Sequence, residues 1–377
     1  MKILIAKAYA KIMFDGLLAR ELKNRGHEVH LLLPERSPEC LGFEQEGISV
    51  WTNPVIQMRY LRQTRLWQDL FHFRGFVRLL RREKYDIVNL HLPAARLFGR
   101  LAARLVPPTR IVSVLHGLEV HHERFSNPLD HATVCVSRAV QQNMAHHHIR
   151  RKKWHVVPNG IDLARMDAVP KDRFFLHREL GLDQSIRLIG MLAYFYEVRD
   201  SVNKGHEFFI DAAARLQDRY PDLRFVIVGS DRLTRGREDF FKAYAQDCGV
   251  ADRIFFLGER HDIVPILDSL TLHVFPSLKE GFGMALIEAM SRGVVNVASD
   301  IPGIREIITD QKDGFLFAPA NAETMFHQIT RLLDNPDLVA ALARQGRRRV
   351  EELFTMTRMG ERYEKIFTDL LPANPTA

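Results

Sequence analysis

The chain has 377 residues, of which 46% are hydrophobic and 26% are charged, values in the ordinary range for globular proteins. At roughly 100–200 residues per domain, this length predicts two domains. No stretch approaches the roughly 18 consecutive apolar residues of a membrane-spanning helix, and the first apolar run, interrupted by Lys7, is too short for a signal peptide. We therefore expect a cytoplasmic protein, with peripheral attachment to the inner face of the membrane as an open alternative.

Cysteine spacing and charge distribution give two further expectations. Cys40, Cys135 and Cys248 lack the paired spacing of disulfides or zinc sites, and no metal is expected. The net charge of +7 is uneven: residues 1–165 contain 26 Lys and Arg against 14 Asp and Glu, or +12, whereas residues 166–377 contain 27 against 32, or −5. A basic half can bind an acidic partner or simply have a basic solvated surface, and both interpretations stay open.

Short runs rich in Val, Ile and Leu predict buried parallel strands along the chain, separated by segments with helical spacing. The helix after the first strand has Phe14, Leu17, Leu18 and Leu22 on one face and ends at Gly26. The strands predicted in the first half are residues 2–6, 28–33, 48–51, 86–90, 110–115, 133–136 and 154–157.

The second half repeats this alternation, with helices expected for example over residues 204–220 and 283–292. Its predicted strands are residues 187–192, 224–228, 253–257, 271–275 and 294–298. Such alternation predicts the α/β class, with two Rossmann-like, doubly wound parallel-sheet domains facing a ligand-binding cleft.

A turn at residues 158–162 and the polar stretch after it place the domain boundary. We assign residues 1–170 to an N-terminal Rossmann-like domain and residues 171–350 to a C-terminal Rossmann-like domain. Residues 351–377 are expected to form a C-terminal helix that crosses back to the first domain, followed by a frayed tail.

The most informative segment is residues 275–290, where a buried strand leads into a loop with two glycines and then into a helix. Free backbone N–H groups of Phe282, Gly283 and Met284 at the helix start, together with the helix dipole, would form an anion site suited to a diphosphate. Glu280 in the loop can reach a donor sugar, and Glu288 in the helix can accept hydrogen bonds from ribose hydroxyls. For either glutamate alone, a capping or surface role is the alternative.

This pattern of two glutamates eight positions apart around Gly-Phe-Gly resembles the signature of the retaining glycosyltransferases of family 4, glycosyl transferases group 1, which have the GT-B fold. Residues 21–29, 158–162 and 204–206 resemble other segments of the same family, so the resemblance covers nearly the whole chain. It implies a retaining enzyme that moves a sugar from a nucleotide-diphosphate donor to an acceptor, with the nucleotide sugar as co-substrate and no other cofactor.

The resemblance also implies residue roles. Glu280 would contact the donor sugar, Glu288 the ribose, and Lys204 the diphosphate, where its charge neutralises the leaving group. His116 follows a predicted strand where the family often has a histidine near the donor sugar; a structural histidine is the alternative. The remaining nucleotide-binding positions are Gly190, Gly229 and Leu257.

The chain departs from the family pattern in two places. The family usually has an arginine shortly before the lysine, whereas the connection here, residues 190–204, is longer than usual. Either Arg199 folds back into that role or Tyr194 takes the place. The turn at residues 7–11 also lacks the paired glycines that are common there.

Residues 59–82 form a basic amphipathic segment that bears on the acceptor. Leu66, Leu70, Phe73, Val77 and Leu80 predict a core stripe, and around them lie six arginines and the aromatic residues Trp67, Phe71 and Phe76. Such a helix can lie on an anionic membrane surface or be an ordinary helix with a solvated face. The basic charge favours a saccharide or lipid-linked acidic acceptor, as in bacterial surface polysaccharide or lipopolysaccharide synthesis, and no motif indicates nucleic-acid binding.

Two other functions remain compatible with the predicted architecture. A sugar-nucleotide epimerase can share it and needs no acceptor. A non-catalytic scaffold with this fold is the other, although Glu280, Glu288 and Lys204 argue against it.

Overall fold

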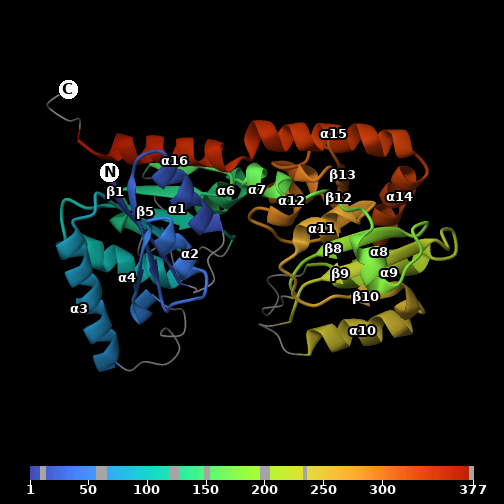
Figure 1. Ribbon diagram of the computed structural model, residues 1–377, viewed down its shortest axis with the longest axis horizontal. Coiled ribbons are helices and arrows are strands. Elements are labelled where there is room, and N and C mark those ends of the chain that lie inside the picture. The colour runs from blue at the N-terminus through green and yellow to red at the C-terminus, as the bar shows by residue number, and fades with distance from the viewer. Residues whose placement is uncertain are drawn as a thin grey trace. The chain divides into compact units, whose positions relative to one another are not determined.

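The computed structural model describes residues 1–8, 14–56, 66–118, 127–147, 153–195, 204–231 and 236–372. The chain forms two compact units (Figure 1). Unit 1 consists of Met1–Gly160 and Thr355–Ala377, and unit 2 consists of Ile161–Phe354. Each unit contains one parallel sheet with helices, which confirms the predicted fold class.

Unit 1 contains a seven-stranded parallel sheet in the order β3-β2-β1-β4-β5-β6-β7. Strand β1 lies at the point where the strand order reverses, because it pairs with both β2 and β4, and Lys7 at its end is in register with His91 at the end of β4. The strands are β1 (Lys2–Lys7), β2 (Glu28–Leu33), β3 (Ser49–Thr52), β4 (Ile87–His91), β5 (Arg110–Leu115), β6 (Ala132–Cys135) and β7 (Trp154–Val156).

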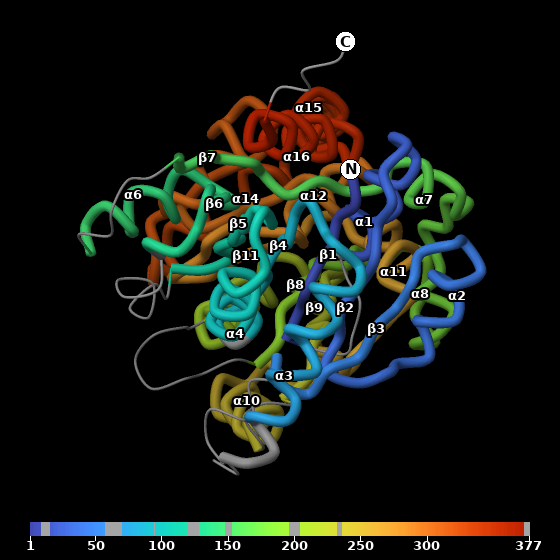
Figure 2. Tube along the Cα trace, turned by 90° about the vertical axis from the view of Figure 1, so that its left-hand side faces the viewer, coloured from blue at the N-terminus to red at the C-terminus, as the bar shows by residue number. Residues whose placement is uncertain are grey.

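The helices of unit 1 cover this sheet. Helices α3 and α4 lie side by side (Figures 1 and 2) and bury an apolar cluster against β1 and β4. The C-terminal helix α16 packs against α1, which places residues 355–372 with the first unit. The elements are α1 (Phe14–Asn24), α2 (Cys40–Gln45), η1 (Pro54–Ile56), α3 (Leu66–Glu83), α4 (Pro93–Arg104), η3 (Asn127–Leu129), α6 (Arg138–His146) and α16 (Met356–Leu370).

Unit 2 contains a six-stranded parallel sheet in the order β10-β9-β8-β11-β12-β13, with the order reversing at β8. Its strands are β8 (Arg187–Leu192), β9 (Leu223–Val228), β10 (Ile254–Phe256), β11 (Leu272–Phe275), β12 (Val295–Ser299) and β13 (Phe315–Phe317). Its helices are α7 (Leu163–Asp167), α8 (Phe175–Leu180), α9 (His206–Leu216), α10 (Arg237–Asp247), η4 (Ala251–Arg253), α11 (Ile263–Asp268), α12 (Met284–Ser291), α13 (Pro302–Arg305), α14 (Ala322–Leu333) and α15 (Pro336–Leu353).

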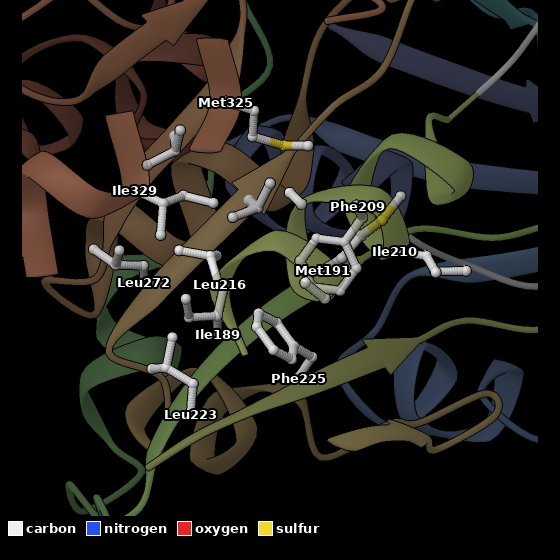
Figure 3. Packing of buried hydrophobic residues seen from close by; sticks show 14 of the residues in the cluster. Ile189, Met191, Phe209, Ile210, Leu216, Leu223, Phe225, Leu272, Met325 and Ile329 are labelled. Carbon is white, nitrogen blue, oxygen red and sulfur yellow. The ribbon is translucent and has the colours of Figure 1, made fainter. Parts of the chain in front are cut away.

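A continuous apolar cluster forms a large part of the core of unit 2. Figure 3 shows how Ile189 of β8 and Phe225 of β9 meet side chains of α9 and α14, among them Leu216 and Ile329. These strands have side chains buried on nearly every position, as expected for parallel strands covered on both faces. The packed core holds the carboxyl ends of β8 and β11 next to each other, where ligands of such sheets bind.

The boundary between the units lies at Gly160 and Ile161, ten residues before the position expected from the sequence. Arg292, at the end of α12, explains the difference. Its guanidinium donates to the backbone oxygens of Met166 and Val169 and forms a buried bidentate ion pair with Asp268, with N···O distances of 2.8 and 2.7 Å. Residues 161–170 are therefore fastened to the second unit.

Of the amphipathic segment predicted over residues 59–82, residues 66–82 belong to α3 and residues 59–65 lie outside the described residues. The buried face of α3 differs in part from the predicted stripe. Val77 and Leu80 are buried as expected, whereas Leu70 is exposed. Phe76, expected among the basic residues, is fully buried, and Phe71 is 74% exposed. Phe76 lies on the same side of the helix as Leu80, which accounts for its burial. Leu70 lies seven residues before Val77 on nearly the same side, so its exposure shows that the core does not cover the helix at this position. No helix in the described ranges has the length and apolar character to cross a membrane.

A buried ion pair ties α4 of unit 1 to the start of β6. Arg100 donates to both carboxylate oxygens of Asp130 at 2.7 and 2.6 Å, and Ser113 of β5 donates to the same carboxylate at 2.8 Å. Both charged side chains are almost completely buried. The carboxylate thus compensates a charge that would otherwise lie unpaired in the core.

We predict that Asp130→Ala lowers the free energy of unfolding of unit 1 by about 3–5 kcal/mol, because it leaves a buried guanidinium uncompensated. Urea unfolding followed by tryptophan fluorescence measures this unit selectively, since Trp51, Trp67 and Trp154 all belong to it. As a matched control, Glu46→Ala removes the exposed ion pair with Arg20 and should cost less than about 1 kcal/mol. Equal effects of the two substitutions would contradict the assignment.

Candidate active site

The loop after β11 and the start of α12 form the centre of the candidate site. Gly283 is the N-cap residue of α12 and supplies no side-chain cap. Within the described ranges, the backbone N–H groups of Phe282, Gly283 and Met284 donate no hydrogen bond. Their unsatisfied donors and the positive end of the helix dipole suit an anion, as the sequence predicts.

Lys204 and Glu280 meet beside this helix start. The Nζ atom of Lys204 lies 2.8 Å from Oε1 of Glu280, and both side chains are only 17% exposed. Residues 76 positions apart in the chain are thus paired at the edge of the sheet. The structure brings together two residues that the sequence assigns to the same reaction.

Two glycines fix the loop that contains Glu280. Gly205 has φ of +79°, and a Cβ there would lie 2.2 Å from the carbonyl oxygen of Pro276. A Cβ at Gly303 in α13 would lie 2.5 Å from the carbonyl oxygen of Glu280. Only glycine permits these approaches, and together they hold the loop between the start of α9 and α13.

Glu288 lies on the second turn of α12 and is half-buried. Within the described ranges, its carboxylate accepts no hydrogen bond, and removal from water raises its pKa to about 7. This direction is opposite to the effect of a helix N-terminus on a nearby acid, so desolvation dominates. Near neutral pH the group is poised between a neutral acid and an anion that can accept hydrogen bonds.

The predicted nucleotide positions Gly229 and Leu257 lie at the same edge of the unit 2 sheet. The N–H of Leu257 donates to the carbonyl of Ile227 at 2.9 Å, and the N–H of Gly229 donates to the carbonyl of Gly258 at 2.9 Å. A Cβ at Gly229 would lie 1.9 Å from the carbonyl oxygen of Ala193. These contacts join the ends of β8, β9 and β10.

The remaining nucleotide positions have different outcomes. Gly190 lies inside β8, where a Cβ would meet the side chain of Leu270 at 2.5 Å, so the structure gives this glycine a packing reason. Arg199 lies outside the described residues. Tyr194, the alternative to Arg199, lies two residues after the end of β8 and is 44% exposed.

His116 belongs to unit 1 and follows the last residue of β5. Its Nε2 lies 3.0 Å from Nδ1 of His91, the last residue of β4. Burial, together with the positive charges of Lys7 and Arg96, lowers the pKa of His91 to about 3 and that of His116 far below its ordinary value. Sequence reasoning missed His91. The signal that singled out His116, a polar residue at the carboxyl end of a strand, also applies to His91 at the end of the neighbouring strand β4.

We predict that Glu288→Gln makes unit 2 more stable above pH 7 and leaves its stability unchanged below about pH 4.5. The folded state keeps a proton on Glu288 up to about pH 7, whereas the unfolded chain releases it near 4.5, so stability falls as the pH rises between these values. The glutamine variant does not lose stability over this pH range, because its side chain does not titrate. Calorimetric melting temperatures at pH 4.5 and pH 8 measure it, with Glu352→Gln on the exposed face of α15 as control. An identical pH dependence of wild type and variant would refute the raised pKa.

Two family models match the chain. Glycosyl transferases group 1 matches residues 192–349, and Glycosyltransferase Family 4 matches residues 17–165, so each model matches most of one unit. The chain is 25% identical over 366 residues to the UDP-Gal:alpha-D-GlcNAc-diphosphoundecaprenol alpha-1,3-galactosyltransferase of Escherichia coli, covering 93% of this chain and 91% of that protein.

Two further comparisons agree with these matches. The chain is 29% identical over 221 residues to the lipopolysaccharide core biosynthesis mannosyltransferase LpsB of Rhizobium meliloti, covering 57% of this chain and 61% of LpsB. The crystal structure of Anabaena HepE in complex with UDP and glucose has a TM-score of 0.84 and 20% identity, covering 98% of this chain and 99% of HepE. This likeness supports the fold, and the family models with the relatives support the activity. The chain is a glycosyltransferase of family 4, group 1, with the GT-B fold.

Proposed function

We propose that this glycosyltransferase moves a sugar from a nucleoside-diphosphate donor to a saccharide or lipid-linked acceptor in the synthesis of a surface polysaccharide or lipopolysaccharide, with retention of the anomeric configuration. The observation that carries the proposal is the uncapped start of α12 with Lys204, Glu280 and Glu288 around it. One cation, free backbone donors and two carboxylates match the charges and hydroxyls of a nucleotide sugar.

In this proposal, the diphosphate binds to the N–H groups of Phe282, Gly283 and Met284 and to the ammonium of Lys204. Because Lys204 is paired with Glu280 in the free protein, the incoming phosphate competes with the carboxylate for the same cation. The cation then neutralises the charge that develops on the leaving diphosphate as the bond to the anomeric carbon breaks. No metal ion is assigned to this step.

The carboxylates take the hydroxyl groups of the donor. Glu280, released from Lys204, accepts hydrogen bonds from the donor sugar, and Glu288 accepts them from the ribose. The pKa of Glu288 near 7 means that its carboxylate is available mainly above neutral pH, so donor binding should tighten as the pH rises through 7. The base lies against the turn at Leu257, where main-chain groups read it, and Gly229 allows the close approach of the strands there.

We assign His116 a role as a neutral ring. Its lowered pKa argues against an imidazolium acid, so we assign it a hydrogen bond to a hydroxyl of the donor sugar. The relatives support transfer rather than epimerisation or a scaffold function, since the Escherichia coli and Rhizobium meliloti proteins are both named as transferases. The name of the Escherichia coli protein gives UDP-galactose as donor and a lipid diphosphate as acceptor, which makes a UDP-sugar the first donor to test.

We predict that Lys204→Ala weakens UDP binding by about 10- to 100-fold, because it removes a charge-assisted contact to the diphosphate. Lys279→Ala, which removes the lysine next to Glu280 in the loop after β11, should change the affinity for UDP by less than about 3-fold. Isothermal titration with UDP measures both, with GDP and ADP in parallel to identify the base. Equal affinities of the two variants, or no binding of any of the three nucleotides to the wild type, would refute the assignment of Lys204.

Glu280→Gln separates binding from transfer. It releases Lys204 from its ion pair, so the affinity for UDP should stay the same or increase, whereas donor turnover should fall at least about 100-fold. Release of UDP from a panel of UDP-sugars, measured with a coupled assay, gives the turnover. Wild-type turnover in this variant would exclude a role of Glu280 in the reaction.

We further propose that unit 1 docks on the membrane through α3 and α4, which would place a lipid-linked acceptor within reach. Leu97 and Leu101 of α4 and its C-cap residue Leu105 form an exposed stripe, with exposed fractions of 36%, 45% and 53%. The neighbouring α3 exposes Phe71 and the arginines at positions 74, 78, 81 and 82. Exposed apolar side chains beside cations suit an anionic bilayer surface.

We predict that the protein sediments with vesicles of phosphatidylcholine and phosphatidylglycerol but stays in solution with phosphatidylcholine alone. Replacing the three leucines of the α4 stripe with serine should reduce the bound fraction at least about tenfold, since several kcal/mol of apolar burial is lost. Phe240→Ser, at an exposed aromatic residue of unit 2, is the control. Recovery of the wild type in solution with both kinds of vesicle would contradict membrane docking.

A further inference from the structure

Two histidines end neighbouring strands of unit 1 and are joined to each other. In the sheet register His91 lies opposite Val114, and His116 lies two residues further along the chain. The ring centroids are 5.1 Å apart and the ring planes differ by 22°. With 3.0 Å between Nδ1 of His91 and Nε2 of His116, this is the geometry of a nearly in-plane hydrogen bond.

The backbone around His91 holds this ring in place. Leu92, the next residue, has φ of 69° and ψ of 156°, a region that bulky residues rarely occupy, and the chain turns there into α4. Four residues later, Arg96 donates to the carbonyl of Val114 at 2.8 Å and ties α4 back to β5. His91 is itself almost completely buried, so its ring has little freedom to rotate.

A hydrogen bond between two neutral imidazoles contains a single hydrogen. If Nδ1 of His91 donates, Nε2 of His116 is the acceptor and His116 must have its own hydrogen on Nδ1. If His116 donates, its Nδ1 is an acceptor. The contact therefore couples the tautomer of His116 to that of His91.

We propose that His91 is a positioning residue of this enzyme, which fixes the orientation and the tautomer of His116. Any hydrogen bond from His116 to a sugar hydroxyl would use Nδ1, because Nε2 is engaged by His91. His91 acts through His116 and touches no substrate itself. The consequence for turnover rests on the proposed function of His116, whereas the effect on its tautomer does not.

Two substitutions separate the hydrogen bond from the packing of the ring. His91→Phe keeps an aromatic ring of similar volume but removes the hydrogen-bonding nitrogen. His91→Asn places an amide near the position of Nδ1 and should restore the bond in part. His30→Phe is the matched control, because it also removes a buried histidine bonded to a neighbour, here the Tyr85 hydroxyl at 2.7 Å.

The tautomer is measured directly in the ligand-free protein. Selective 15N labelling of histidine and long-range 1H–15N correlation spectra report which ring nitrogen has the hydrogen, and His116→Phe assigns the His116 signals. We expect a single His116 tautomer in the wild type and in His30→Phe, a mixture or the opposite tautomer in His91→Phe, and the wild-type tautomer in His91→Asn. An unchanged His116 tautomer in His91→Phe would overturn the proposal.

Turnover tests the functional consequence in the intact chain, by release of UDP from the UDP-sugar that the wild type hydrolyses fastest. We expect His91→Phe to lower kcat by about 10- to 100-fold with the donor KM within about 3-fold, and His91→Asn to recover most of it. The double variant with His116→Phe should be no slower than the slower single variant, because both substitutions disable one unit.

The outcomes separate the effect of His91 on turnover from its effect on the tautomer of His116. Multiplying losses in the double variant would overturn a role of His91 through His116. Wild-type turnover in His116→Phe would refute the proposed function of His116 and the catalytic part of this inference, while the tautomer spectra would still decide whether His91 orients the ring. A melting temperature of His91→Phe matching that of His30→Phe excludes loss of folding as the cause of a lower kcat.

Discussion

The close contact between Gly205 and the carbonyl oxygen of Pro276 is the constraint on which the arrangement of the unit 2 site depends. Only a residue without Cβ can bring the start of α9 so near to the loop after β11, and the adjacent Lys204 then reaches Glu280. Gly303 imposes an equally close contact on the opposite side of that loop. The free N–H groups at the start of α12 are thus oriented before a ligand arrives, which is the arrangement that electrostatic stabilisation requires.

Charge balance in this site has two different sources. The charge of the Glu280 carboxylate is compensated by a neighbouring ammonium at 2.8 Å, whereas the charge of Glu288 is reduced near pH 7 by the rise in its pKa. The negative charge of the two glutamates is therefore smaller than their number suggests, and the helix start adds a partial positive charge. An incoming diphosphate meets a field that favours it, although two glutamates lie within one short segment of chain.

Much of the fold could be predicted because its strands are buried on both faces and stand out as apolar runs. The strand β13, residues Phe315–Phe317, was missed, although β7 and β10 are edge strands of the same length that the sequence predicted. In α3 the pattern placed Leu70 in the core stripe and Phe76 among the basic residues, and both placements were wrong, because the packing of neighbouring elements decides which positions of the helix are covered.

The candidate site, like the fold, could be predicted from the sequence only in part. The sequence placed Lys204 and Glu280 in one reaction, but it did not predict that they form an ion pair. The bond between His91 and His116 needed the strand order of unit 1, which brings β4 and β5 together. The packing role of Gly190 depends on Leu270, a contact that no local pattern encodes.

The position of α16 has a consequence for how the protein is made. This helix packs on α1, yet the whole of unit 2 separates the two in the chain. On the ribosome, unit 2 can be complete while the surface of α1 still waits for its partner, because domains fold as their last residues emerge. The unit that is synthesised first is therefore finished last, and a nascent chain cut short before Met356 would leave that surface without its cover.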